Sequence, residues 1–350
     1  MSGTWEPVGL GLITVLISAA RKNITGVIVA ASKSFIAHLR FHDFRYLLRL
    51  RRQQNRYLRT ADRPRCAMLH PAGERRSTNS NIDRDGTRYR AMKDRIVEIP
   101  TKAGRMPTFV THPEQDGPFP PVIVFMDVWG VRDELYDIAR RIGTIGYYAM
   151  VPDFYYRQGT IRQTYIDVDG KRISLAKLPK EEHDKVVAKS AATPDWMIVD
   201  DVGAIIQFIA TSGEPAKAGG IGSVGYCMGG RHAQVAAVNY PDHFKASASL
   251  HGTYLISDKP DSSHRKLAGM RGEYYCGFAA TDHYAPPEMI AELSSILSKC
   301  PSVRYTPVIH QGTLHGYALP DRDIYAKAAA ERDWELIFAM YHRQIPPYAR

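Results

Sequence analysis

The sequence is poor in cysteine and lacks an apolar run long enough to cross a membrane. Four cysteines in 350 residues, at positions 66, 227, 276 and 300, are too few and too scattered for a disulfide framework or a paired zinc knuckle. The apolar stretches Val8–Ala20 and Ile24–Ala31 each fall short of the ~20 residues that span a bilayer, and Arg21 and Lys22 separate them. A signal peptide fits poorly because the leading residues carry no positive charge. These absences favour a reducing, cytoplasmic setting.

Acidic residues are scarce only at the N-terminal end. Residues 1–91 hold 17 Lys and Arg against 6 Asp and Glu, whereas the remaining residues hold 29 against 30. A nucleic-acid-binding protein is expected to carry its basic surface on the folded domain. The confinement of the excess positive charge to residues 1–91 therefore argues against a nucleic-acid partner. We therefore expect a basic extension over 1–91, poorly ordered or partly helical, and one folded domain over 92–350. Residues 1–60, rich in arginine and aromatics, are a candidate for weak contact with an anionic membrane.

From residue 94 onward, short β-like runs alternate with helical ones. Arg95–Ile99 and Pro107–Thr111 flank a predicted hairpin turn, and Pro121–Met126 is a continuous apolar run typical of a strand buried on both faces. Further strands are expected over 147–151, 221–226, 246–250, 273–278 and 303–309, and helices over 133–145, 196–209, 231–238, 287–297 and 324–341. This alternation predicts an α/β fold with a mostly parallel sheet and helices on both faces.

The segment GYCMGG, residues 225–230, contains the most informative motif. Gly225-x-Cys227-x-Gly229 lies between a predicted strand and a predicted helix, which is the nucleophile-elbow pattern with sulfur in place of the serine oxygen. The turn is so tight that side chains two positions either side of the nucleophile would collide with backbone. Cys227 is thereby placed at a helix N-terminus, where the dipole favours thiolate.

Two other interpretations of this segment remain. Cys227 could be a buried structural cysteine, which the flanking strand and helix make the less favoured reading. Gly220-x-Gly222-x-x-Gly225 also spells a dinucleotide-binding fingerprint, but the apolar strand residues lie inside and after it rather than before it. We therefore expect no dinucleotide or other cofactor and no metal.

A thiol nucleophile needs a base, and the base needs an orienting acid. In an α/β-hydrolase both follow the nucleophile, the acid first, on loops after later strands. Asp282 and His315 occupy such positions. Three other histidines compete for the role of base. His251 ends a predicted strand that comes before the acid in the chain, His283 adjoins the acid, and His310 lies at the end of the predicted strand 303–309 rather than on the loop after it.

These residues resemble the dienelactone hydrolase family of α/β-hydrolases, which use a Cys–Asp–His triad. The resemblance extends over residues 95–345 through PVIVFMDVWG (121–130), GYYAMVPDFYYRQG (146–159), GYCMGG (225–230), TDHYAP (281–286) and LHGY (314–317). It implies that Cys227 is the nucleophile, His315 the base and Asp282 its orienting acid. It also implies an oxyanion hole made by the backbone N–H groups of Met228 and Val128.

The chain departs from the family pattern at two places. Asp127 stands where members commonly carry a glutamate near the resting thiol, so the supporting carboxylate is one methylene shorter. Members that act on dienelactone are expected to have an arginine shortly after the histidine, whereas residues 316–320 contain none and Arg322 is the nearest. This departure counts against an acidic lactone as substrate. The insertion Thr160–Lys189 is expected to cap the pocket and to supply a different anion clamp, with Tyr165, Lys171, Arg172 and Lys177 as its candidate residues.

The sequence thus predicts a carboxymethylenebutenolidase-like hydrolase that cleaves an ester or lactone bond of a small molecule through a thioester acyl-enzyme. The alternative is a non-catalytic, redox-responsive α/β-hydrolase-like protein whose thiol senses oxidant. An intact triad in the expected chain order favours the enzyme.

Overall fold

The computed structural model describes residues 91–349 except 115, 160–164 and 168. The predicted basic extension lies outside the described residues apart from Ala91. The fold begins with an antiparallel hairpin of β1 (Met92–Thr101) and β2 (Gly104–Pro113), in which Thr101 pairs with Gly104. The predicted hairpin is confirmed.

Eight strands form one sheet in the order β1-β2-β4-β3-β5-β6-β7-β8. β1, β2 and β4 pair antiparallel, and all pairs from β4 to β8 are parallel. The strands after the hairpin are β3 (Pro121–Phe125), β4 (Tyr148–Pro152), β5 (Ile221–Tyr226), β6 (Phe244–Leu250), β7 (Gly272–Thr281) and β8 (Val303–Leu314). The described part of the chain therefore has the α/β-hydrolase architecture that the sequence predicts. Because these strands run parallel, the loops that follow them meet at one edge of the sheet.

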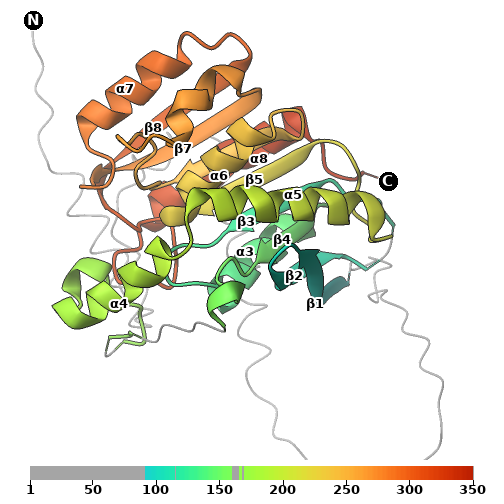
Figure 1. Ribbon diagram of the computed structural model, residues 1–350, viewed down its shortest axis with the longest axis horizontal. Coiled ribbons are helices and arrows are strands. Elements are labelled where there is room, and N and C mark those ends of the chain that lie inside the picture. The colour runs from blue at the N-terminus through green and yellow to red at the C-terminus, as the bar shows by residue number, and fades with distance from the viewer. Residues whose placement is uncertain (1–90, 115, 160–164, 168, 350) are drawn as a thin grey trace, which may run out of the picture. The chain divides into compact units, whose positions relative to one another are not determined.

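Helices cover both faces of the sheet. They are α3 (Asp133–Thr144), α4 (Lys180–Ala191), α5 (Asp195–Thr211), α6 (Met228–Asn239), α7 (Pro287–Leu297) and α8 (Lys327–Gln344). In Figure 1, α5 and α6 lie in front of the sheet. α3 and α8 are joined by an ion pair between Arg141 and Glu331, with 2.7 Å between Nη2 and Oε2.

Strand β5 shows how tightly these layers pack. A Cβ at Gly222 would lie 2.5 Å from Ile345, just beyond α8, whereas one at Gly225 would lie 1.9 Å from the carbonyl oxygen of Gly229 in α6. The two glycines therefore let a helix approach each face of the same strand. All five residues of β3 and all six of β5 are buried, as expected for central strands. No helix in the described ranges is long and apolar enough to cross a membrane.

Candidate active site

Cys227 lies in the turn between β5 and α6. Its backbone has φ 56° and ψ −118°, a left-handed conformation that L-residues rarely adopt. A Cβ at Gly229 would lie 2.3 Å from the carbonyl oxygen of Phe125, so both glycines of the elbow are sterically required. The strain at Cys227 is sustained by these close backbone contacts, and it places the thiol at the start of α6.

The two peptide groups around Cys227 are firmly held. Its N–H lies 3.0 Å from the carbonyl oxygen of Leu250 and 3.1 Å from Nδ1 of His251. Its carbonyl oxygen accepts hydrogen bonds from the N–H groups of Gly230, at 3.0 Å, and Thr253, at 3.1 Å. This bonding leaves the side chain of Cys227, which is partly exposed, facing a cavity.

His315 and Asp282 meet at the same edge of the sheet. Nδ1 of His315 donates to Oδ2 of Asp282 at 2.7 Å, and Oδ1 of Asp282 accepts the N–H of Tyr284 at 2.9 Å. Burial of the His315 ring disfavours its charged form, but the Cys227 sulfur and then Asp282 outweigh that penalty and raise the pKa of His315 to about 10. The structure thus brings Cys227, Asp282 and His315 together: His315 is bonded to Asp282, lines the same cavity as Cys227, and has its Nε2 buried without a hydrogen-bond partner among the described residues.

The other histidines have different surroundings. His310 lies 2.6 Å, Nε2 to Oδ1, from Asp333, a fully buried carboxylate that also accepts hydrogen bonds from the hydroxyls of Tyr275 and Tyr317. His283 lines the cavity and packs on Tyr284, with 3.7 Å between ring centroids. His310 is therefore bonded in a buried network separate from the Cys227 thiol.

His251 is closer to the thiol than its place in the chain suggested. It is fully buried, accepts the N–H of Cys227 on Nδ1, and packs edge-on against His315 with 5.1 Å between ring centroids. Burial, reinforced by the charges of His315 and Arg322, holds its pKa well below the usual value. A neutral ring that accepts on Nδ1 carries its proton on Nε2. The sequence analysis weighed His251 only as a competing base; its bond to the Cys227 N–H was not foreseen, because the parallel pairing of β6 with β5 brings the two residues together.

Two backbone N–H groups beside Cys227 are left without acceptors. Within the described residues, neither Val128 nor Met228 donates its N–H to a protein atom. Val128 follows the buried strand β3, and Met228 is the first residue of α6. Both residues line the cavity with Cys227. They have the chain positions expected of oxyanion-hole donors.

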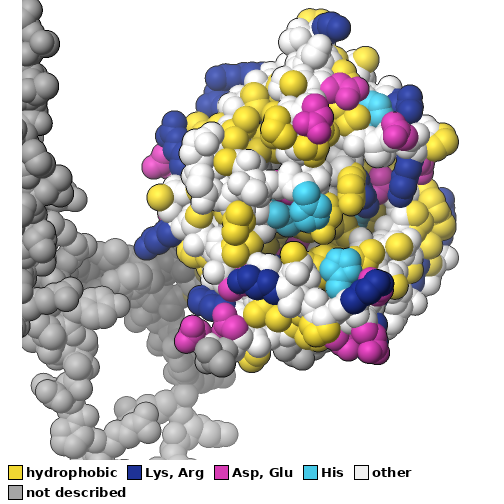
Figure 2. Space-filling view, turned by 90° about the vertical axis from the view of Figure 1, so that its left-hand side faces the viewer, with side chains coloured by type: hydrophobic (Ala, Val, Ile, Leu, Met, Phe, Trp, Pro, Cys, Tyr) yellow, Lys and Arg dark blue, Asp and Glu magenta, His cyan; other side chains and the backbone are white. Residues whose placement is uncertain are grey.

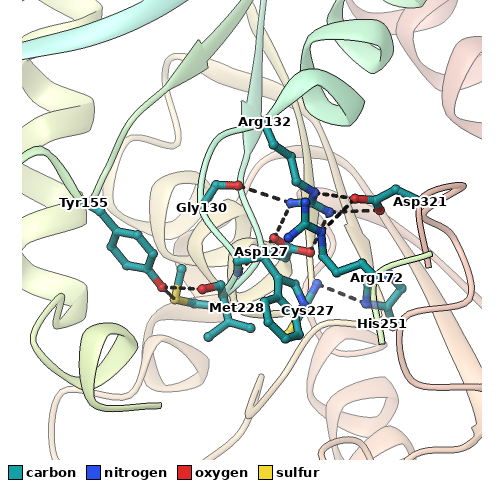
Figure 3. A network of polar contacts seen from close by, with 11 residues as sticks. Asp127, Gly130, Arg132, Tyr155, Arg172, Cys227, Met228, His251 and Asp321 are labelled. Atoms are coloured by element: carbon teal, nitrogen blue, oxygen red, sulfur yellow. Dashed lines mark hydrogen bonds and ion pairs between the residues drawn. The ribbon is translucent and has the colours of Figure 1, made fainter. Parts of the chain in front are cut away.

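Asp127 is held by an arginine that sequence reasoning overlooked. Nη1 and Nη2 of Arg132 donate to its two carboxylate oxygens at 2.7 and 3.0 Å, and Arg132 also binds Asp321 at 2.6 Å (Figure 3). Burial alone would lower the pKa of Arg132, but these carboxylates raise it above its ordinary value. Among the described residues no hydrogen bond joins Asp127 to Cys227. Asp127 instead ties the Val128 loop to the loop that follows His315.

The insertion caps the pocket, but two of its cations, Arg172 and Lys177, are engaged elsewhere. Ser174, Leu175 and Ala176 line the cavity. Arg172 bonds Asp321, Nε to Oδ2, at 3.1 Å, and Lys177 bonds Asp323 at 2.6 Å. The insertion is thereby fastened to the loop after His315, and these charges are neutralised there rather than offered to a ligand.

Arg322 lines the cavity together with Arg231. It is only 6% exposed, its guanidinium lies 4.9 Å from the ring centroid of Trp129, and its Nε is buried without a hydrogen-bond partner. No ion pair neutralises it within the described residues. Burial lowers the pKa of Arg322 from its ordinary value. A buried, unpaired guanidinium is costly, which points to an anion as its partner.

The cavity that holds these groups has a volume of about 260 Å³. Figure 2 shows the hollowed face, with histidine side chains near the hollow. A second chamber of about 480 Å³ shares four residues with it, namely Val187, Ser190, Arg231 and Tyr254. The two cavities are therefore adjacent, with these four residues on their shared wall.

Residues 106–344 match the model of the dienelactone hydrolase family. The chain belongs to the dienelactone hydrolase family. It is 24% identical over 245 residues to "Putative carboxymethylenebutenolidase" of Methylorubrum extorquens, covering 68% of this chain and 77% of the relative. It is also 24% identical to the protein of the same name in Escherichia coli K12, and the match covers 69% of this chain and 83% of that relative.

The fold of this dienelactone hydrolase family member is also found in solved structures. The structure titled "Putative Dienelactone Hydrolase" from Klebsiella pneumoniae matches with a TM-score of 0.61 and 22% identity, over 72% of this chain and 99% of that one. A dienelactone hydrolase-like promiscuous phosphotriesterase from metagenomic libraries matches with a TM-score of 0.54 and 17% identity, over 73% of this chain and 99% of that one. At these sequence identities, the two matches show that the fold is shared.

Proposed function

We propose that the protein hydrolyses an ester or lactone bond in a small molecule that carries a carboxylate. Cys227 is the nucleophile, His315 the general acid and base, and Asp282 the residue that orients His315. The N–H groups of Val128 and Met228 form the oxyanion hole. The observation that carries the proposal is the position of His315, which is bonded to Asp282 at 2.7 Å and lines one cavity with Cys227.

The raised pKa of His315 favours its protonated form, and the proposed mechanism starts from this imidazolium beside the Cys227 sulfur. The thiolate attacks the carbonyl carbon, and the carbonyl π electrons move to oxygen, which the two N–H groups stabilise. Collapse of this tetrahedral intermediate breaks the bond to the alkoxide, and the alkoxide takes the proton from Nε2 of His315. The products of this half-reaction are a thioester on Cys227, a free alcohol and a neutral His315.

Loss of the thiolate charge prepares the second half-reaction. The Cys227 sulfur is the leading cause that raises the pKa of His315, so acylation removes that cause and favours the neutral ring. Neutral His315 then accepts a proton from water as the water attacks the thioester. Collapse of the second intermediate releases the acid and restores the thiolate beside a protonated His315.

The substrate class follows from Arg322. Its unpaired guanidinium beside Trp129 is suited to bind a carboxylate, and burial strengthens that interaction. The name of the curated relatives describes a lactone bearing a carboxymethylene group, which is the same combination of functional groups. In this proposal Arg322, and not the insertion, binds the substrate anion, because Arg172 and Lys177 of the insertion are already paired with carboxylates.

Purified protein with small lactones, monoesters of dicarboxylic acids and p-nitrophenyl acetate tests the proposal. We expect turnover by the wild type, none by Cys227→Ala, and an acyl adduct on Cys227 visible by mass spectrometry after quenching. Turnover that persists in Cys227→Ala would contradict the mechanism. A thiol that oxidises readily in a protein without any turnover would support the redox-responsive alternative.

A further inference from the structure

Tyr155 lies beneath the two candidate oxyanion-hole residues. It follows β4 by three positions and is fully buried. Its hydroxyl lies 3.1 Å from the carbonyl oxygen of Val128 and 3.7 Å from the Met228 sulfur (Figure 3). One hydroxyl thus contacts both residues whose N–H groups are unpaired beside Cys227.

The state and orientation of this hydroxyl are well defined. Burial, followed by the nearby charges of Asp127 and Cys227, raises the pKa of Tyr155 far above its ordinary value, so the phenol keeps its proton. The backbone N–H of Tyr155 is bonded to Oδ1 of Asp153 at 3.0 Å, which anchors the residue. The single hydroxyl proton goes to the carbonyl of Val128, which is the nearer and stronger acceptor, while the sulfur of Met228 packs against the phenol oxygen.

The bond to Val128 controls a peptide plane next to the reacting centre. The peptide between Val128 and Trp129 is held at both ends: Tyr155 donates to its carbonyl, and its N–H donates to Oδ1 of Asp127 at 3.1 Å. With that plane fixed on one side of the Val128 Cα, the N–H on the other side has little freedom to turn away. The peptide unit that carries the Val128 N–H is itself held by one bond, from the Gly130 N–H to the carbonyl of Asp127 at 3.1 Å, whereas the unit that carries the Met228 N–H is held by two, from Gly230 and Thr253 to the carbonyl of Cys227.

We propose that Tyr155 is a positioning residue for the oxyanion hole, which it preorganises by holding the Val128 peptide in the orientation that directs its N–H toward the substrate oxygen. This inference rests on the proposed function. It predicts a defect confined to steps that develop negative charge on a carbonyl oxygen, because Tyr155 bonds neither Cys227 nor His315 in the structure.

Two reactions of the same thiol separate this role from a structural one. Acylation of Cys227 by p-nitrophenyl acetate passes through a tetrahedral oxyanion. Alkylation by iodoacetamide forms a sulfur–carbon bond as iodide leaves, and no oxyanion develops. Positioning of the oxyanion hole therefore affects the first rate alone, whereas displacement or loss of the thiolate affects both.

The experiment compares both rates in the wild type, Tyr155→Phe and the control Tyr147→Phe. Tyr147 is also fully buried, but its hydroxyl has no hydrogen-bond partner among the described residues, so this substitution removes a hydroxyl that supports no neighbouring group there. We expect Tyr155→Phe to slow acylation by at least about tenfold, less than the 10²–10³-fold typical for deleting an oxyanion-hole donor itself. Alkylation should stay within about twofold of the wild type, and Tyr147→Phe should match the wild type in both reactions.

Three results would overturn the inference. Unchanged acylation in Tyr155→Phe would show that the Val128 peptide needs no support. An equal loss of acylation and alkylation would show that Tyr155 only maintains the fold, and the melting temperature would fall with it. A wild-type protein that iodoacetamide alkylates but that forms no acyl adduct on Cys227 would remove the proposed function itself, and the inference with it.

Discussion

The guanidinium of Arg322 lies over the indole of Trp129, 4.9 Å from the ring centroid, with its Nε buried and unpartnered. The ring supplies a favourable surface for the cation but no charge, so the guanidinium keeps its capacity to bind an anion. The three residues 320, 321 and 323 around it are engaged by Lys171, Arg172 and Lys177. The insertion therefore fixes the loop and leaves its arginine for the ligand.

Arg322→Gln is expected to impair hydrolysis of carboxylate-bearing esters selectively. Loss of charge-assisted hydrogen bonds to a ligand costs about 1.5–3 kcal/mol, or roughly 10–150-fold in kcat/KM. The neutral ester p-nitrophenyl acetate should be hydrolysed within a few fold of the wild-type rate. Arg231→Gln is the matched control, because Arg231 lines the same cavity but already pairs with Asp195, Nε to Oδ1, at 3.1 Å. Equal losses for charged and neutral esters would argue against anion binding by Arg322.

Replacing His315 and His310 one at a time should distinguish a histidine needed for turnover from one needed for the stability of the fold. His315→Ala is expected to lower turnover by about 10²–10⁴-fold, since both half-reactions need its proton transfers. His310→Ala should leave turnover nearly intact but destabilise the fold by about 1–3 kcal/mol, because the buried Asp333 loses a partner. Kinetics and urea unfolding of the two variants provide the measurement. An inactive but stable His310→Ala would contradict the assignment of the base.

Stability should depend on pH differently in the wild type and Cys227→Ala. The pKa of His315 is raised from 6.5 to about 10 in the folded state, chiefly because the Cys227 sulfur outweighs burial. A raised folded-state pKa contributes stability that is fully present below pH 6.5 and is lost as the pH rises through about 10. Cys227→Ala lacks the principal cause of that rise. The melting temperature of the wild type relative to the variant is therefore expected to decline between pH 6.5 and 10, and a constant difference would contradict the ion pair.

Iodoacetamide at neutral pH should label Cys227 faster than the other cysteines. Cys276 is fully buried, and burial raises its pKa to about 12, while Cys300 is 6% exposed. Cys227 is partly exposed and lines the cavity together with His315, the proposed base. Peptide mapping by mass spectrometry at short times gives the relative rates. Labelling of Cys66, which lies outside the described residues, at the rate of Cys227 would count against an activated thiol.

A chain beginning at Met92 is expected to express as a folded protein and keep its activity. β1 starts at Met92, and all of Cys227, Asp282 and His315 lie beyond it. The remaining 259 residues are enough for one complete hydrophobic core. A melting temperature within a few degrees of the full chain would support the division at 91/92, and an insoluble or inactive product would contradict it.

The amino-acid sequence alone predicted those features that depend on local sterics and chain order. The elbow glycines are recognisable because no other residue fits where Cβ would lie 1.9 or 2.3 Å from a carbonyl oxygen. Buried parallel strands appear as continuous apolar runs, and the loops after them must meet at one sheet edge. The α/β-hydrolase fold and the order Cys227, Asp282, His315 were therefore accessible without coordinates.

Only the tertiary structure decided which side chains, far apart in the sequence, form hydrogen bonds and ion pairs with one another. Arg132 engages Asp127 and Asp321, which are 194 positions apart in the numbering, and this pairing rather than any local pattern determines what Asp127 can contact. In the part of the chain that the structure describes, Arg172 is paired with a carboxylate and Arg322 is not, and the hydroxyl of Tyr155 bonds a carbonyl oxygen whereas that of Tyr147 bonds none. Hydrogen bonds and ion pairs extend over about 3–4 Å, so a side chain's role depends on neighbours brought into that range by folding, and position along the chain does not specify those neighbours.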